Sequence, residues 1–450
     1  MFGKDEIKAS CQEAIGYSAS DQIEAVIIAN HSMLTRFANS TIHQNMEDQD
    51  CVAKIRVVRG KRIGSASTNI MSSISIRETV KRAEDIASAS KEDHEFICLP
   101  KPGQIQEVSG FSQRTADYSY QQMAEDVRRV IEKAEAAQCK VAGAYSKNII
   151  EIGCANSLGI MANASLTNAS IIIVAEKDGS TGYGSGLSSD IGKIDIEAVA
   201  SIAIEKSLKG IGASEIPPGE YEVVLEPPAV ADLLLFLGYL GFGALAYQEG
   251  RSFVCGNLGK RIVGENITIW DDAIDPVGMP VPFDFEGMPK EKVVLIENGV
   301  AKGLVYDSYT AHKEGRISTG HSLPQPNTSG PIPTNLFMKE GEHTKDELIS
   351  ATKKGILVTR FHYTNVIEPM KCVITGMTRD GAFLIENGRI TKPIKNMRFT
   401  QSVLEALSSV SMIGKERQLS CEGTIMDFPS GCYVPCLKID KFCFSGKTEF

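Results

Sequence analysis

The stretch Ala229-Val-Ala-Asp-Leu-Leu-Leu-Phe-Leu-Gly-Tyr-Leu-Gly-Phe-Gly-Ala-Leu-Ala-Tyr247 decides how the chain is organised, because fifteen of its residues in a row, 233–247, carry no charge. A helix needs about 20 apolar residues to cross a bilayer, so this stretch is too short to do so. We interpret it as a buried helix in the core of a large domain. Its three glycines let another backbone approach closely, although they lower helix propensity. They are Gly238, Gly241 and Gly243.

The composition is that of an ordinary globular protein with room for two or three domains. The chain has 450 residues, of which 42% are hydrophobic and 23% are charged, and its net charge is −9. This acidic balance makes nucleic acids and anionic membranes poor electrostatic partners, so we predict neither. The segment Met1–Glu6 does not resemble the start of a signal peptide, and the 11 scattered cysteines favour reduced thiols over disulfides. We therefore expect a cytoplasmic protein.

Turn and linker signals divide the chain into parts, and the pattern predicts an α+β fold. We expect an N-terminal α+β domain at 1–95, a linker at 96–117, a central α+β domain at 118–216 and a C-terminal β-rich domain at 217–450. Apolar residues at helical spacing predict helices at Ser75–Ser90 and Tyr120–Ala137. The Gly-rich segment Asp178–Gly186 fits neither a phosphate-binding loop nor a nucleophile elbow, and we predict a flexible loop there.

The C-terminal part consists mostly of short β segments separated by turns. The dipeptides Asn298-Gly299 and Asn387-Gly388 are strong hairpin signals. We predict a mostly antiparallel sheet that is barrel-like or rolled. The segment Pro324–Pro333 is too rich in proline for regular structure, so we expect an extended surface loop of the kind that lines a groove.

Several segments in this order resemble the TldD/PmbA family, the proteins first described as modulators of DNA gyrase and now regarded as metalloprotease-type proteins. The resemblance covers nearly the whole chain, and it implies proteolysis or peptide processing by a dimeric protein. The matching segments are Arg36–Asn39, Val57–Gly64, Phe283–Gly287, Arg316–His321, Gly355–Asn365, Gly376–Gly381 and Phe383–Gly388.

The zinc motif of the family is replaced in this chain. In the catalytic TldD branch, the helix before a Gly-x-Ser segment carries His-Glu-x-x-x-His, where two imidazoles hold Zn²⁺ and the carboxylate takes a proton from the metal-bound water. Counting back without gaps from the Gly-Arg-Ser at 250–252 places these positions on Leu235, Phe236 and Leu240, none of which can bind a metal or move a proton. The chain therefore looks most like the TldE/PmbA branch. The resemblance implies a subunit that has no catalytic residue and no cofactor of its own.

The resemblance also implies partners and a substrate. The chain would assemble with a zinc-bearing TldD-type subunit, or with itself as a homodimer, and the complex would process unfolded peptides. This chain would supply structure and part of the substrate channel. The candidate groove residues are His321, Arg316, His362 and Arg379, of which His362 is interpreted first as a sheet-face histidine.

Two other functions remain open. The first is an active hydrolase or metallopeptidase with a relocated site, in which Cys421 or Cys432 works with His321; such a thiol needs a base that lowers its pKa. Cys436 lies at ligand-like spacing from Cys432, so these three cysteines are also weak candidates for a metal site. The second is a non-enzymatic protein that modulates gyrase.

One pair of carboxylates has a structural interpretation. Asp284 and Glu286 lie two residues apart at a glycine turn, and we interpret the pair as part of a solvated loop.

Overall fold

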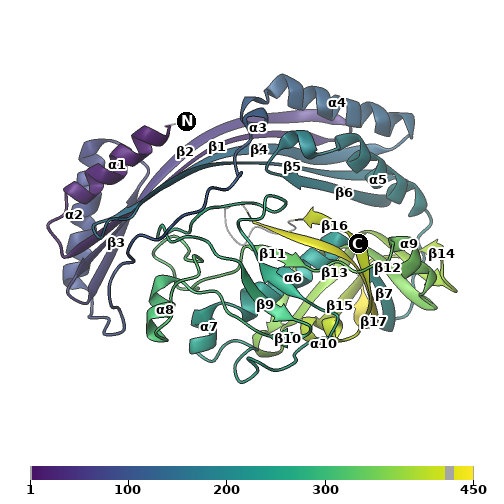
Figure 1. Cartoon of the computed structure of the whole chain (residues 1–450). Helices are drawn as coiled ribbons and strands as arrows, with labels where there is room; N and C mark the ends of the chain where they lie inside the picture. Colours follow the sequence, from purple (N-terminus) through teal and green to yellow (C-terminus); the bar gives the residue numbers. More distant parts are fainter. Residues whose placement is uncertain (1–2, 421–429, 449–450) are drawn as a thin grey trace.

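A long curved sheet arches over a second, β-rich body in this computed structural model, which describes residues 3–420 and 430–448 (Figure 1). The curved sheet is antiparallel and its strand order is β3-β2-β1-β4-β5-β6. The two predicted N-terminal units thus contribute three strands each to one sheet. The strands are β1 (Gln22–Ala38), β2 (Thr41–Arg59), β3 (Arg62–Thr68), β4 (Lys140–Asn156), β5 (Met161–Lys177) and β6 (Ser180–Ser188).

Helices cover the convex face of this sheet, and the C-terminal body lies beneath its concave face (Figure 1). Two of these helices confirm the predictions from apolar spacing, with ends that differ by one or two residues. Their N-termini are capped by the side chains of Ser72 and Ser119, and Ser119 forms a capping box with Gln122. The helices are α1 (Lys4–Gly16), α2 (Ser73–Ala89), α3 (Gln113–Asp117), α4 (Tyr120–Ala136), the 3-10 turn η1 (Ile191–Lys193) and α5 (Ile196–Lys209).

The predicted flexible loop at 178–186 is wrong, because most of it is the edge strand β6. Its glycines serve close packing, not mobility. A Cβ on Gly182 would lie 2.1 Å from the carbonyl oxygen of Ala203, and one on Gly184 would lie 2.3 Å from that of Val199. Without side chains at these positions, the backbone of α5 can rest directly on the strand.

The C-terminal body confirms the predicted rolled sheet. Its 11 strands include β17, which pairs with both β15 and β7, so that β17, β15, β13, β12 and β7 close a ring. Two pairs, β11–β17 and β12–β7, are parallel, and the other ladders are antiparallel. The strands are β7 (Gly219–Leu225), β8 (Ile269–Asp271), β9 (Val293–Glu297), β10 (Val300–Ala301), β11 (Asn335–Met338), β12 (Lys354–Glu368), β13 (Val373–Glu386), β14 (Arg389–Pro393), β15 (Met397–Ser402), β16 (Val410–Ser420) and β17 (Gly431–Lys447).

The uncharged stretch forms the buried helix that its sequence predicts, followed by a short second helix. It packs against β12, β16 and β17 within the largest apolar core. In the described part of the chain, no helix is both long and apolar enough to cross a membrane. The helices of this body are α6 (Pro227–Gly241), α7 (Ala244–Gln248), α8 (Ser308–Lys313), the 3-10 turn η2 (Pro369–Lys371), α9 (Lys345–Ser350) and α10 (Val403–Ser408).

The glycines of this stretch admit close neighbours. A Cβ on Gly243 would lie 2.3 Å from the carbonyl oxygen of Pro331, so the proline-rich segment runs directly against the break between α6 and α7. A Cβ on Gly241 would meet the ring of Phe253 at 2.1 Å. The predicted backbone approach is therefore confirmed at Gly243, while at Gly241 the neighbour is an aromatic ring.

We predict that Gly184→Ala lowers the free energy of unfolding by about 1–3 kcal/mol, because the new methyl group must push α5 away from β6. Gly16→Ala is the matched control, since no atom lies within 4 Å of a Cβ at that position, and its effect should stay within about 0.5 kcal/mol. Urea unfolding of the full chain measures both. Equal midpoints for the two variants would show that the strand and the helix can separate without cost.

Candidate functional site

The C-terminal half of α6 carries Leu235, Phe236 and Leu240, on which the gap-free count from the Gly-Arg-Ser segment predicts the zinc-motif positions. Leu240 is buried in the main core, Phe236 is half-buried and packs against that core, and Leu235 is half-buried. Their side chains contain only carbon and hydrogen, so this helix face does not fit a zinc ion, which takes nitrogen, oxygen or sulfur ligands. Within residues 3–420 and 430–448, no group of three or more His, Cys, Asp or Glu side chains is placed to hold a metal ion.

A polar path leads from α6 to the curved sheet. The Thr364 hydroxyl donates to Asp232 Oδ2 at 2.7 Å, and burial raises the pKa of Asp232 to about 6. Four residues before Thr364 on β12, Arg360 donates through Nε and Nη2 to Asp380 Oδ2 at 2.8 and 2.6 Å. The same guanidinium lies 4.4 Å from the ring centre of Tyr183 on β6, so it holds the two bodies together at this end.

The four candidate groove residues lie in three places. His362 and Arg379 lie close together on the paired strands β12 and β13, where burial and the nearby arginines lower the pKa of His362. Arg316 lies on the exposed turn after α8 and interacts with Glu314 at 3.2 Å. His321 is fully buried. Contact of any of these residues with a substrate remains a prediction.

His321 is held by hydrogen bonds on both ring nitrogens. Its Nε2 lies 2.9 Å from Asp271 Oδ1, and its Nδ1 lies 2.9 Å from the hydroxyl of Thr319. Burial, together with the nearby Lys290 ammonium, lowers the pKa of the imidazole. The imidazole of His321 therefore lies in the interior of the C-terminal body, a position that the sequence could not show.

The cysteine candidates are buried where the structure describes them. Cys432 and Cys436 lie on β17 with 4% and 9% of their surface exposed. Burial raises the pKa of Cys436 to about 12, so its thiol stays protonated at neutral pH and is a poor nucleophile or metal ligand. Cys421 lies outside the described residues.

A buried ion pair joins the two bodies at the opposite end. Arg56 on β2 donates to Glu24 on β1 at 2.7 Å and to Glu286 of the C-terminal body at 3.0 Å. The solvated-loop interpretation of Asp284 and Glu286 is wrong, because each is only 3% exposed. The neighbouring Phe283 and Phe285 explain this burial. Both pack in an apolar cluster against the concave face of the curved sheet, so the carboxylates between and beside them are buried as well.

The backbone around this ion pair satisfies the buried carboxylates. Asp284 accepts hydrogen bonds from the amides of Glu286, Met288 and Ser322 at 2.8–2.9 Å. Even so, burial and the neighbouring Glu286 raise the pKa of Asp284 to about 8. Lys290, also buried, lies near Asp284, and burial lowers the pKa of its ammonium group. Ionisable groups thus cluster where the two bodies meet.

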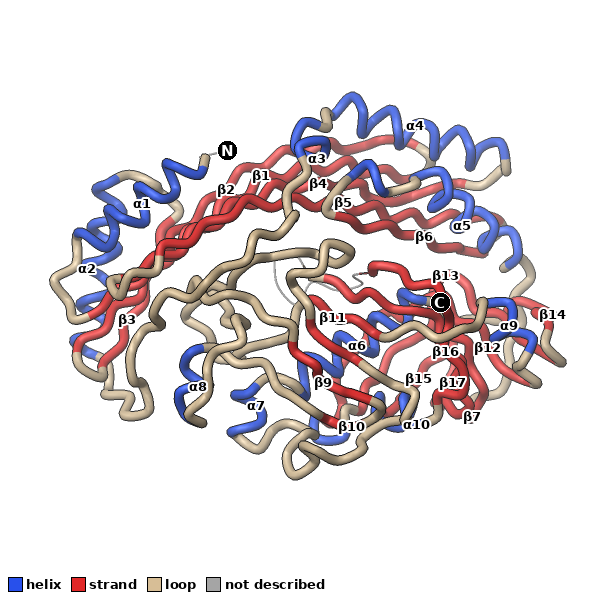
Figure 2. Tube along the Cα trace, viewed as in Figure 1, coloured by secondary structure: helices blue, strands red, loops and turns tan. Residues whose placement is uncertain are grey.

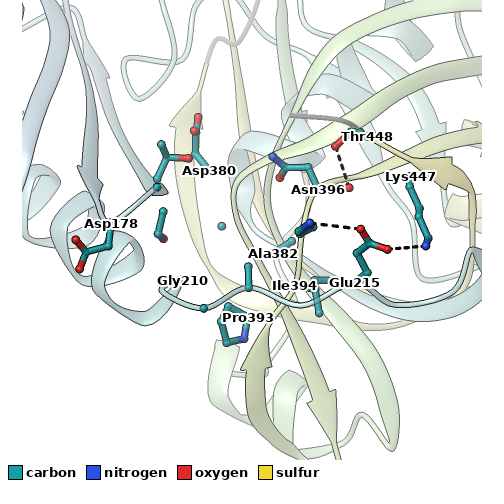
Figure 3. A pocket seen from close by; sticks show the side chains of 17 residues that line it. Asp178, Gly210, Glu215, Asp380, Ala382, Pro393, Ile394, Asn396, Lys447 and Thr448 are labelled. Carbon is teal, nitrogen blue, oxygen red and sulfur yellow. Dashed lines mark hydrogen bonds and ion pairs between the residues drawn. The ribbon is translucent and has the colours of Figure 1, made fainter.

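A cavity of about 870 Å³ lies at the junction, between the β5–β6 turn, the connection that follows α5, the middle of β13, the β14–β15 connection and the end of β17. Its lining includes Asp380, the partner of Arg360. Figure 3 shows Asp178 on one side and Glu215 on the other. Glu215 accepts hydrogen bonds from Lys395 at 3.3 Å and from Lys447 at 2.6 Å. Both bodies line this space, which is large enough for an extended polar ligand such as a peptide.

Comparison with known proteins finds the same architecture elsewhere. Residues 218–446 match the model of the PmbA/TldA metallopeptidase C-terminal domain, and residues 23–87 match that of the PmbA/TldA metallopeptidase domain 1. The Metalloprotease TldD homolog of Buchnera aphidicola is 26% identical over 437 residues, covering 91% of this chain and 89% of that protein.

Two crystal structures share the fold. TldE from Thermococcus kodakarensis is similar with a TM-score of 0.87 at 22% identity, covering 98% of this chain and 100% of that chain. A protein from Thermotoga maritima, described as a candidate modulator of a DNA gyrase, has a TM-score of 0.84 at 19% identity, covering 94% of this chain and 95% of that chain.

We predict that Arg56→Met destabilises the chain by about 3–5 kcal/mol, because it leaves two buried carboxylates without their cation. Arg62→Met is the control, since Arg62 is 46% exposed and lies 3.6 Å from an equally exposed Glu92. That variant should lose no more than about 1 kcal/mol. Thermal and urea unfolding of both variants measure the difference, and similar losses would contradict the assigned role of the buried pair.

We predict that Asp284 contributes stability to the folded chain that is lost as the pH rises from about 4 to about 8. The raised pKa of Asp284 means that the folded state keeps a proton that the unfolded state has already released across this range. Asp284→Asn should make this decline less steep, whereas Glu265→Gln, at a residue that is 82% exposed, should leave it unchanged. Urea midpoints across the pH range test this, and equal slopes for wild type and Asp284→Asn would refute it.

Proposed function

The chain belongs to the PmbA/TldD metallopeptidase family, and from this membership we propose that it is the TldE-like subunit of a cytoplasmic peptide-processing complex. A TldD-type subunit would hold the zinc ion and carry out peptide hydrolysis. This chain would assemble with it and build part of the path along which an unfolded peptide reaches the metal.

The observation that carries the proposal is the apolar face of α6. Leu235, Phe236 and Leu240 lie where the catalytic branch has two histidines and a glutamate. These apolar side chains contribute to packing, because Leu240 belongs to the main core and Phe236 packs against it. A polar motif at these positions would remove apolar contacts from the core, which supports a structural role for this helix.

The junction between the two bodies supports a role in guiding peptides. The curved sheet spans the whole C-terminal body (Figure 1), and the bodies are held together at both ends by Arg56 and Arg360. The 870 Å³ cavity lies at the Arg360 end and is lined by backbone and polar side chains from both bodies. An extended peptide presents backbone donors and acceptors that such a lining can match.

A relocated hydrolase site has less support. His321 is fully buried, and its ring nitrogens are hydrogen-bonded to Asp271 and Thr319 instead of to a cysteine thiol. Burial also keeps the Cys436 thiol protonated. A relocated site would need both groups to be exposed and rearranged.

We predict that the purified, untagged chain contains no stoichiometric zinc, and that its mixture with a TldD-type subunit contains one zinc per pair. Elemental analysis after gel filtration measures both. The control is the same mixture with the two motif histidines of the partner replaced by alanine, which should contain no zinc. About one zinc per isolated chain would overturn the proposal and direct attention to Cys421, Cys432 and Cys436.

A further inference from the structure

A second cavity, of about 460 Å³, lies between α3, α4 and α5. These helices lie on the convex face of the curved sheet, so the cavity is on the opposite side from the C-terminal body (Figure 2). We propose that this outer cavity binds the oxyanion group of a small molecule, either a carboxylate or a phosphate. The inference does not depend on the proposed partnership.

The floor of the outer cavity contains a hydroxyl group without a partner. Tyr145 on β4 lines the cavity with none of its surface exposed, and its hydroxyl makes no hydrogen bond within the described residues. Burial raises its pKa, and the Asp126 carboxylate nearby adds to this effect through its charge and a weak contact with the hydroxyl. That contact lies outside the geometry of a hydrogen bond, so the hydroxyl can still donate to a bound group. The phenol is therefore a protonated donor, and leaving such a donor buried without an acceptor is costly.

A guanidinium group on the cavity wall is also unpaired. Arg114 of α3 makes no ion pair or hydrogen bond with any residue that the structure describes. Its side chain lies flat against Gly192, where a Cβ would come within 2.0 Å of Nη1. The glycine thus leaves the room in which the guanidinium rests beside the cavity.

The N-terminus of α5 supplies further donors. This helix has 14 residues, and its first turn, with Ile196 and Glu197, lines the cavity. The Asp195 side chain caps the amide of Ala198 at 2.9 Å, but the first-turn amides of Ile196 and Glu197 have no acceptor within the helix. The partial positive charge at this end of the helix also favours an anion.

The carboxylates around the outer cavity are already engaged. Asp126 accepts from the Tyr118 hydroxyl at 2.5 Å and forms an ion pair with Arg129, while the carboxylate of Asp195 is used by the helix cap. Glu197 lies 3.9 Å from the same Arg129.

Lys133, the remaining cation of the lining, donates to the backbone oxygen of Glu197 at 3.2 Å. The donors that remain are the Tyr145 hydroxyl, the Arg114 guanidinium and the start of α5. Apart from the Asp195 cap, no lining carboxylate accepts a hydrogen bond from these three donors in the described part of the chain, and an oxyanion supplies several acceptors at once. The volume of the cavity leaves room for a small organic portion beside that group.

Isothermal titration of the full chain with inorganic phosphate and with acetate, at constant ionic strength in chloride, tests the proposal. We expect saturable binding of at least one of these anions at one site per chain, and the tighter of the two identifies the oxyanion class. Tyr145→Phe and Arg114→Gln should each weaken this binding at least about tenfold.

The control variant is Arg128→Gln, which removes the same charge from the exposed side of α4 outside the cavity and should bind as wild type does. Tyr145→Phe removes only a hydroxyl without a partner, so it should fold normally, which circular dichroism verifies. Absence of saturable binding of both anions, or equal affinity of Tyr145→Phe and wild type, would overturn the proposal.

Discussion

The buried contact of Arg56 with Glu24 and Glu286 is the constraint on which the arrangement of the two bodies depends. Removing charges from water is costly, and the attraction within such a pair offsets this cost only where its geometry is good and further hydrogen bonds support it. In the described part of the chain the Nε of Arg56 has no hydrogen-bond partner, so the support comes from the carboxylate side. Here the apolar cluster around Phe283 and Phe285 excludes water, and backbone amides satisfy the adjacent carboxylates. The orientation of the curved sheet over the ring of strands follows from this contact at one end and from that of Arg360 with Tyr183 at the other.

Local patterns in the sequence predicted the elements whose signals are local. The apolar spacing of α2 and α4, the uncharged stretch of α6 and the Asn-Gly hairpin turns all confirm this, and so does the rolled C-terminal sheet. The sequence also placed Leu235, Phe236 and Leu240 together on one helix. The helices and hairpins could be predicted because the neighbours that define them lie within a few turns or across one short turn. The rolled sheet was predicted only as a class, since its closing pair joins β7 and β17 from opposite ends of the domain.

Long-range burial is what the sequence could not show. From the sequence alone, Asp284 and Glu286 resemble a solvated turn. Their burial comes from the packing of Phe283 and Phe285 against the concave face of the curved sheet, whose contacting strands lie more than a hundred residues earlier in the chain. The many glycines of β6 are also typical of a flexible loop, and only the packing of α5 against the strand shows why they are needed there. The burial of His321 depends on Asp271, fifty residues away. The alternation Phe-Asp-Phe-Glu at 283–286 was the one sequence signal of this burial, since apolar residues at every second position favour a segment with one buried face.

In the proposed complex, catalysis belongs to the partner and this chain supplies structure. The most direct test is hydrolysis of an unstructured peptide by the isolated chain, by its mixture with a TldD-type subunit, and by the same mixture with the motif glutamate of that subunit changed to glutamine. The account predicts hydrolysis only in the mixture with the unaltered partner. Hydrolysis by the isolated chain, or undiminished hydrolysis in the mixture with the altered partner, would contradict it.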